Sequence, residues 1–175
     1  MPSYILSEKC MSAAGEKLHK FVQNKFPEKI ITVENQKVAK VAVTVDGTWQ
    51  RRGHNSKMGV VFVIYVDTGE ILDVEMKSLT CNQCSINSAK LGTNSTEFKE
   101  WFQSHKASCS INHTKSSAAM ESAGASDIFK RSIEKHCLMY STFVGDGDSD
   151  CMPLLKNLAD MTWKKKNVLV TSGSG

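Results

Sequence analysis

Two aspartates stand at the inner ends of apolar runs that have strand composition. Asp46 ends the β-branched run 38–46, and Asp146 ends the run 138–146. If these strands are neighbours in a sheet, both carboxylates project at one edge, and Mg²⁺ or Mn²⁺ relieves their repulsion with hard oxygen ligands. Two such ions about 3.5–4 Å apart activate a nucleophile and stabilise a leaving oxygen in phosphodiester chemistry. The alternative is that both aspartates cap turns.

Glu121 is a third acidic candidate. It lies early in a predicted helix, residues 117–136, where a carboxylate can face the same acidic cluster. The alternative is an ordinary glutamate on a helix surface.

Cysteines and a histidine form the most specific spacing in the chain. Cys81-x2-Cys84 is followed, after twenty residues, by His105-x3-Cys109. Two close pairs are typical of a tetrahedral Zn²⁺ site, because each pair holds the metal from one turn. A polar segment such as 80–116 has little core of its own, so a bound zinc would help it fold. The alternatives are scattered reduced thiols, or His113 as the ligand in place of His105.

The elements that position these residues follow from hydrophobic periodicity. Helical spacing predicts helices over three segments, and β-branched or alternating runs predict four strands. The second and third strands, joined by a turn at 67–70, complete a three-stranded antiparallel meander with the first. In the third strand Ile71, Val74, Met76 and Leu79 lie close to one face, and Asp73, Glu75 and Lys77 lie on the other. The expected segments are helices 11–25, 95–106 and 117–136, and strands 38–46, 58–67, 70–79 and 138–146. The fold class is therefore α/β.

Composition sets broad limits. The chain has 175 residues, is 41% hydrophobic and carries a net charge of +4, which suits one compact domain and permits a nucleic-acid partner. No signal peptide is visible and the longest apolar run is too short to span a bilayer, so we expect a soluble intracellular protein. Six cysteines are then thiols or metal ligands rather than disulfides. Arg51, Arg52 and Lys164–Lys166 are candidates for phosphate contacts.

Five motifs in this order resemble the Mutator-like transposase domain found in animal transposable elements: "TVDGTWQRRG", "DTGEILDVE", "CNQC", "SSAAME" and "GDGDS". The resemblance covers about residues 41–149. It implies a ribonuclease H-like mixed sheet in β-β-β-α-β order with a zinc-binding insertion after the third strand. It also implies an acidic DDE triad that uses Mg²⁺ or Mn²⁺ for DNA cleavage and strand transfer.

The resemblance assigns roles to individual residues. Asp46 matches the first triad aspartate, and Asp146 the second, with Asp148 as the alternative in the same motif. Glu121 matches the acidic position of the family's Met-Glu motif. The family's cysteine–histidine insertion is matched by Cys81, Cys84, His105 and Cys109.

The resemblance also sets expectations for the whole chain. We expect an N-terminal helical flank (1–40), a transposase domain (41–171) with its insertion at 80–116, and a linker-like tail (172–175). The family's third acidic residue lies in a downstream helical region with a Glu-Cys pair. No such pair follows Ser149, so a truncated or decayed core is expected.

Three functions fit these observations. The first is a nuclear transposase core that acts on transposon-end DNA. The second is a catalytically inactive, zinc-containing domain that binds DNA or protein. The third is a ribonuclease H-type nuclease completed by Glu121.

Overall fold

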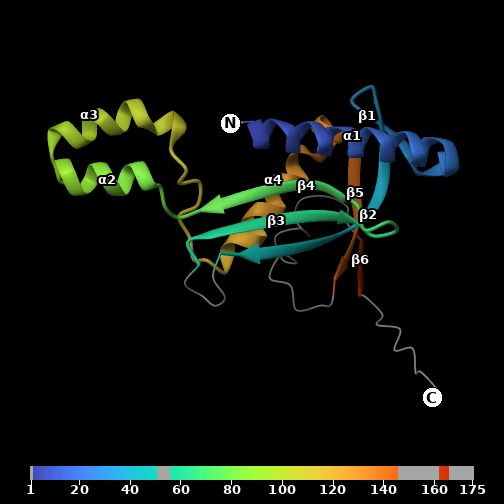
Figure 1. The fold of residues 1–175 in the computed structure, drawn as a ribbon. Helices are drawn as coiled ribbons and strands as arrows, with labels where there is room; N and C mark the ends of the chain where they lie inside the picture. Colours follow the sequence, from blue (N-terminus) through green and yellow to red (C-terminus); the bar gives the residue numbers. More distant parts are fainter. Residues whose placement is uncertain (1, 51–55, 146–161, 166–175) are drawn as a thin grey trace, which may run out of the picture.

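The computed structural model describes residues 2–50, 56–145 and 162–165, and shows a mixed α/β fold (Figure 1). No helix within these ranges is both long and apolar enough to cross a membrane. In chain order the elements are α1 (Pro2–Lys25), the 3-10 turn η1 (Pro27–Lys29), β1 (Ile30–Val33), β2 (Gln36–Trp49), β3 (Met58–Tyr65), β4 (Ile71–Ser78), α2 (Asn82–Leu91), α3 (Thr96–His105), the 3-10 turn η2 (Lys106–Ser108), α4 (Ala119–His136), β5 (Leu138–Gly145) and β6 (Thr162–Lys165).

The sheet has the strand order β4-β3-β2-β5-β6, and β1 pairs with the start of β2. The predicted antiparallel meander is confirmed as β2, β3 and β4. Its second turn uses Gly69 at φ 75°, a left-handed conformation that glycine adopts without strain. β5 lies beside β2 and runs parallel to it, so the two predicted strands that carry the acidic candidates are neighbours. The prediction that the first of them ends at Asp46 was wrong, because β2 stays paired with β3 as far as Trp49 and Asp46 lies three residues before its end. Helix α2 and strands β1 and β6 were not predicted.

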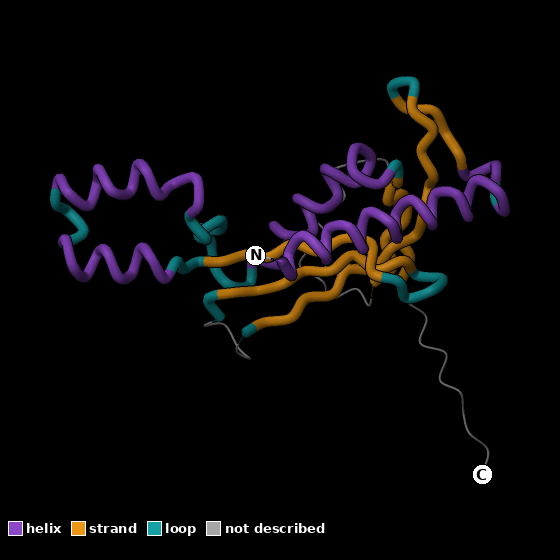
Figure 2. The backbone as a smooth tube through the Cα atoms, turned by 45° about the horizontal axis from the view of Figure 1, so that its top comes forward, coloured by secondary structure: helices purple, strands orange, loops and turns teal. Residues whose placement is uncertain are grey.

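Helix α4 packs on one face of the sheet and buries Met120 and Ile128, whereas Ile133 is half-buried. A Cβ on Gly124 would lie 2.7 Å from Val61 Cγ2, so glycine lets α4 approach β3 closely. Figure 2 shows α1 and α4 against the strands, with the α2–α3 pair standing clear of them. The hydrophobic core that contains Ile128 also takes Leu18 and Val22 from α1.

The faces of β4 are a departure from the usual apolar-inside pattern. The polar residues Asp73, Glu75 and Lys77 pair with the β3 residues that face α4, whereas Met76 on the other face is 51% exposed. Helix α4 supplies the compensating charges. Arg131 donates hydrogen bonds to Asp73 and Glu75, Lys135 to Asp73, and Lys77 to Asp127. Charge pairing between α4 and β4 therefore replaces apolar packing along this edge.

Asp73 is the centre of this network and has no exposed surface. Burial by itself would raise the pKa of Asp73, but the nearby His136 ring, whose Nε2 lies 3.5 Å from Oδ2, and hydrogen bonds from Arg131 and Lys135 hold it well below its usual range. The Asp73 Oδ2–Arg131 Nε distance is 2.8 Å and the Asp73 Oδ1–Lys135 Nζ distance is 3.0 Å. The carboxylate is thus ionised and paired throughout the physiological pH range.

The outer edge of β4 is covered by other parts of the chain. The side chain of Asn112 donates to the Met76 carbonyl (2.7 Å) and accepts from the Ser78 N–H (2.8 Å). The backbone N–H groups of Asn112 and His113 donate to the Ser78 carbonyl, and Arg131 donates to the Val74 carbonyl. An edge whose polar groups are occupied in this way is a poor template for pairing with another strand.

We expect Asn112→Ala to destabilise the protein by about 1–3 kcal/mol, because it leaves a carbonyl and an N–H of β4 without partners. Urea unfolding measures this, and sedimentation reports any self-association at the opened edge. Asn87→Ala is the control, since Asn87 only bonds the Gln83 carbonyl within an exposed helical turn. Equal losses in the two variants would show that Asn112 does not protect the edge.

Candidate metal centre and the acidic end of strand β2

Residues 82–105 form a helical arm, α2 and α3, that projects from the end of β4 (Figure 1). Ser95 caps α3 by accepting from the Phe98 N–H at 3.0 Å, which fixes the tip of the arm. Neither helix contains a buried residue, although the structure describes every residue of both. Packing alone therefore gives the arm little stability.

Four candidate ligands meet at the base of the arm. Cys81 and Cys84 lie where α2 begins, and His105 and Cys109 lie where α3 ends. One ligand atom from each of the four residues lies within 4.8 Å of all the others. Within the described part of the chain, this is the one group of three or more such residues close enough to hold a metal.

The distances suit a tetrahedral zinc ion. Cys84 Sγ and Cys109 Sγ are 3.6 Å apart, and Cys81 Sγ and His105 Nε2 are 3.3 Å apart. Zinc–sulfur bonds of about 2.3 Å and zinc–nitrogen bonds of about 2.0–2.1 Å give tetrahedral edges of about 3.8 and 3.6 Å. The donor set of three thiols and one imidazole is also one that zinc prefers. The four residues therefore fit this metal.

Neighbouring groups orient the histidine. The Nε2 atom of His105 faces the cysteines, and its Nδ1 atom lies 3.3 Å from Ser108 Oγ. A hydrogen bond between Nδ1 and Ser108 would hold the proton on Nδ1 and leave Nε2 free to bind a metal. The ring of Trp101 stacks on His105 with centroids 4.6 Å apart, and Phe98 packs against Trp101. The aromatic side chains of α3 thus form a small hydrophobic cluster beside the candidate ligands. Ser108 was not predicted, because a lone serine carries no spacing signal.

The cluster holds thiols of unlike acidity. Backbone hydrogen bonds from Ser110 and Cys84 lower the pKa of Cys81 to about 5, so it is a thiolate at neutral pH. Burial, together with the neighbouring Cys109 and Cys81, raises the pKa of Cys84 to about 12. A divalent cation would remove this difference by stabilising every thiolate.

The alternative ligand His113 lies elsewhere. It is buried, its Nε2 is 3.0 Å from the Ser116 carbonyl, and its backbone N–H bonds Ser78. The structure therefore groups His105, and not His113, with the three cysteines.

The acidic candidates lie on the body of the molecule. Asp46 is exposed, and its Oδ1 accepts from the Gly47 N–H at 2.8 Å. Glu121 Oε2 lies 3.4 Å from the position that a Cβ on Gly47 would occupy. Helix α4 thus brings Glu121 to the strand end that carries Asp46. Gly47 pairs with Val61 and lies on the face of the sheet that α4 covers, so Glu121 approaches from this face. Successive residues of a strand point to opposite faces, so Asp46 lies on the other face of the sheet.

Asp146 and its alternative Asp148, which belong to the second acidic motif, lie outside the described residues. Arg51 and Arg52 also lie outside them. The final pair of the parallel ladder, Val43 with Phe143, lies three residues before Asp46 in one part of the sequence and three before Asp146 in the other. Lys164 and Lys165 lie on β6.

Comparison with known proteins gives one family. The family model described as Mutator-like transposase matches residues 5–170. No curated protein and no solved structure gives a significant match. Because the match spans nearly the whole chain, from α1 through the cysteine–histidine cluster to β6, the chain belongs to the Mutator-like transposase family.

Proposed function

We propose that this chain is the catalytic-core domain of a Mutator-like transposase, which cleaves DNA and transfers strands with the help of divalent metal ions. The observation that carries the proposal is the parallel pairing of β2 with β5. The paired residues of β2 and β5 precede Asp46 and Asp146 in the sequence. The strand order of the sheet is compatible with a ribonuclease H-like fold. Residues 41–171 form this domain in the proposal, with its insertion at 80–116 and a tail at 172–175. Residues 1–40 form the flank that packs on it.

In this proposal Asp46 and Asp146 hold Mg²⁺ or Mn²⁺, and Glu121 on α4 is the third acidic residue, which approaches the same part of β2 from the opposite face of the sheet. When bound, the ions supply a metal-activated nucleophile and stabilise the leaving oxygen. The residues of the chain position the ions and the phosphate between them. DNA is the partner, which would place the protein in the nucleus. The cluster of Cys81, Cys84, His105 and Cys109 holds a structural zinc that keeps the arm folded.

A second candidate is an inactive, zinc-containing domain that binds DNA or protein. It is favoured by the contrast between the two sites. The cysteine–histidine cluster is closely assembled, whereas the Asp46 carboxylate is exposed and accepts a hydrogen bond from the neighbouring Gly47 N–H.

Calorimetric titration of the zinc-loaded protein with Mn²⁺ tests the proposal. We expect binding by the parent, and at least about tenfold weaker binding by Asp46→Asn and Asp146→Asn, since each substitution removes an anionic ligand. Asp67→Asn is the matched control, because Asp67 lies in the turn after β3 and bonds Tyr65. If the parent binds no Mn²⁺, or all three variants bind equally, the strand ends are not a metal site. The inactive domain would then be the better description. Mn²⁺-dependent nicking of a supercoiled plasmid tests the chemistry separately.

A further inference from the structure

The arm carries an unpaired basic surface. Within residues 80–116 the acidic residues are Glu97 and Glu100, whereas the lysines are Lys90, Lys99, Lys106 and Lys115. Lys99, Lys106 and Lys115 are exposed, and none of them forms a salt bridge with another described residue. The three are named the lysine row below.

Helical geometry places two members of the row together. Lys99 and Lys106 are seven residues apart along α3 and η2, so they lie within about 20° of each other around the axis and about 10.5 Å apart along it. On the same helix Glu97 and Glu100 are turned away from Lys99 by about 160° and 100°. The acidic residues of the arm are therefore not on the stripe that carries these lysines.

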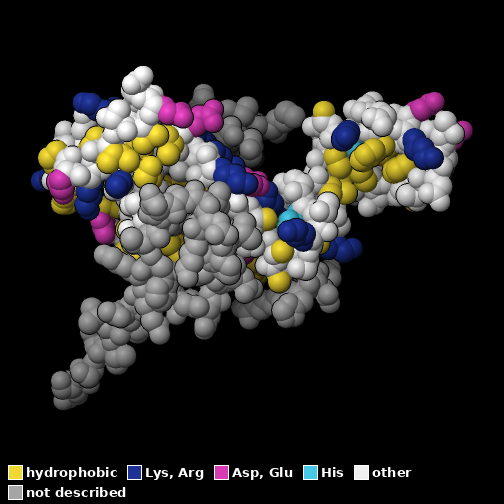
Figure 3. Space-filling model, turned by 180° about the vertical axis from the view of Figure 1, so that it is seen from behind, with side chains coloured by type: hydrophobic (Ala, Val, Ile, Leu, Met, Phe, Trp, Pro, Cys, Tyr) yellow, Lys and Arg dark blue, Asp and Glu magenta, His cyan; other side chains and the backbone are white. Residues whose placement is uncertain are grey.

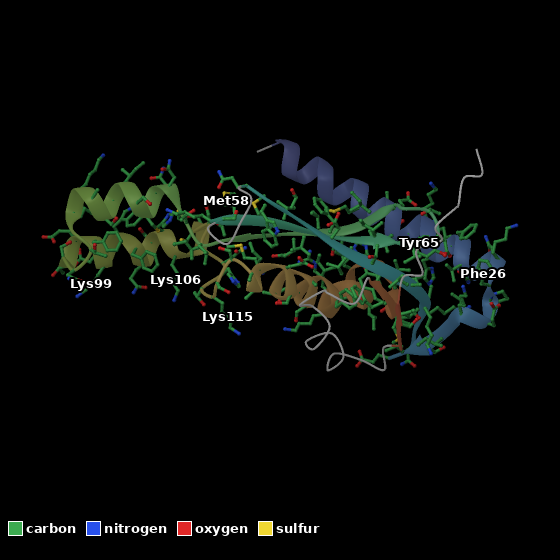
Figure 4. All side chains as sticks on the ribbon, turned by 90° about the horizontal axis from the view of Figure 1, so that it is seen from below. Phe26, Met58, Tyr65, Lys99, Lys106 and Lys115 are labelled. Atoms are coloured by element: carbon green, nitrogen blue, oxygen red, sulfur yellow. The ribbon has the colours of Figure 1, made fainter. Side chains whose placement is uncertain are left out.

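The views of the molecule agree with this separation. Figure 4 shows Lys99, Lys106 and Lys115 along one side of the arm, from its outer part to the loop before α4. Figure 3, seen from behind, shows basic side chains beside a hydrophobic patch on the arm, with acidic side chains at its outer end.

The basic groups near β4 and α4 differ from the row because carboxylates already neutralise them. Lys77 pairs with Glu75 and Asp127, and Arg131 pairs with Asp73 and Glu75. A polyanion approaching α4 meets balanced charge there, but meets uncompensated charge on the arm. The row ends at Lys115, shortly before the start of α4, the helix that carries Glu121.

We propose that the lysine row contacts the phosphate backbone of duplex DNA and holds it beside the acidic end of β2. Ammonium groups on flexible stems, spread over an exposed helix face, suit phosphates rather than base edges, so the contact would be independent of sequence. The aromatic residues of α3 do not read bases in this arrangement, because Trp101 is stacked on His105. This inference rests on the proposed function, which supplies DNA as the substrate.

The test is fluorescence anisotropy of a labelled 30-base-pair duplex with the zinc-loaded full chain, over a series of salt concentrations. In the arm variant Lys99, Lys106 and Lys115 are replaced by Ala. The control variant replaces Lys20, Lys25 and Lys37, which are also exposed and lie on α1 and at the start of β2 rather than on the arm. Both variants lose three positive charges.

We expect the slope of log K against log salt to fall by about 2–3 in the arm variant, since each phosphate contact contributes about 0.9. The control variant is expected to keep the parent slope. Zinc content and circular dichroism confirm that both variants are folded.

Four results would overturn the inference. Equal losses in both variants would mean that only net charge matters. An unchanged arm variant would place the DNA elsewhere while leaving the transposase proposal intact. Binding of polyglutamate as tight as that of the duplex would point to an acidic protein partner. Absence of DNA binding by the parent would overturn the inference and also remove DNA as the partner in the proposed function, which the Mn²⁺ titration tests independently.

Discussion

Removing zinc is expected to unfold the α2–α3 arm while the sheet stays folded. The arm has no buried residue in either helix, so the link from Cys81 and Cys84 to His105 and Cys109 supplies most of its stability. Structural zinc sites contribute about 10–16 kcal/mol in isolated finger peptides, far more than the exposed packing of this arm provides. Amide hydrogen exchange should show loss of protection across residues 82–105 after chelation, and preserved protection in β2 and β3.

Single substitutions make the same test without a chelator. Cys84→Ser should lower the zinc content from one ion per chain to near zero and remove the helical signal of the two ten-residue helices. Cys137→Ser is the control, since this thiol lies outside the cluster and accepts a hydrogen bond from Gln36 at 2.9 Å. Full zinc content in Cys84→Ser, or a protected arm in the chelated protein, would show that the metal is not what folds the arm.

Asp73→Asn is expected to lower the free energy of unfolding by about 3–5 kcal/mol. The substitution removes the charge of a fully buried carboxylate on β4. Arg131 on α4 then keeps Glu75, but Lys135 loses its ion pair with Asp73, and breaking a buried ion pair has a cost of this size. Urea unfolding at neutral pH measures it. The control is Asp127→Asn, whose side chain is 45% exposed and whose partner Lys77 keeps Glu75. We expect a loss of about 1 kcal/mol or less there.

The same carboxylate predicts how stability depends on pH. Because folding lowers the pKa of Asp73, its contribution is complete above the ordinary aspartate pKa of about 3.9 and is lost as the pH falls below that value. The parent should therefore lose more stability between pH 4 and pH 2 than Asp73→Asn does. Parallel curves for the two proteins, or a neutral-pH loss no larger than that of Asp127→Asn, would show that the network does not stabilise the fold.

Local sequence determined much of this protein. The β-branched runs formed the meander, the amphipathic pattern at 117–136 formed α4, and the spacing Cys81-x2-Cys84 with His105-x3-Cys109 identified four residues that the fold brings together. The strands and the helix depend on residues that are close together in the chain. The metal centre depends on cysteine and histidine at close spacings, a combination that is typical of metal sites. Periodicity and spacing report such features directly.

The tertiary structure decided the rest. The alternation in β4 separates Met76 from Asp73, Glu75 and Lys77, but it does not say which face is covered. Helix α4 lies on the polar face because its Asp127, Arg131 and Lys135, at i, i+4 and i+8, present matching charges. The choice of His105 over His113 likewise depends on where the chain returns to β4 through Asn112. Pairings between residues about 50 to 60 positions apart leave no mark on local periodicity, so only the folded chain reveals them.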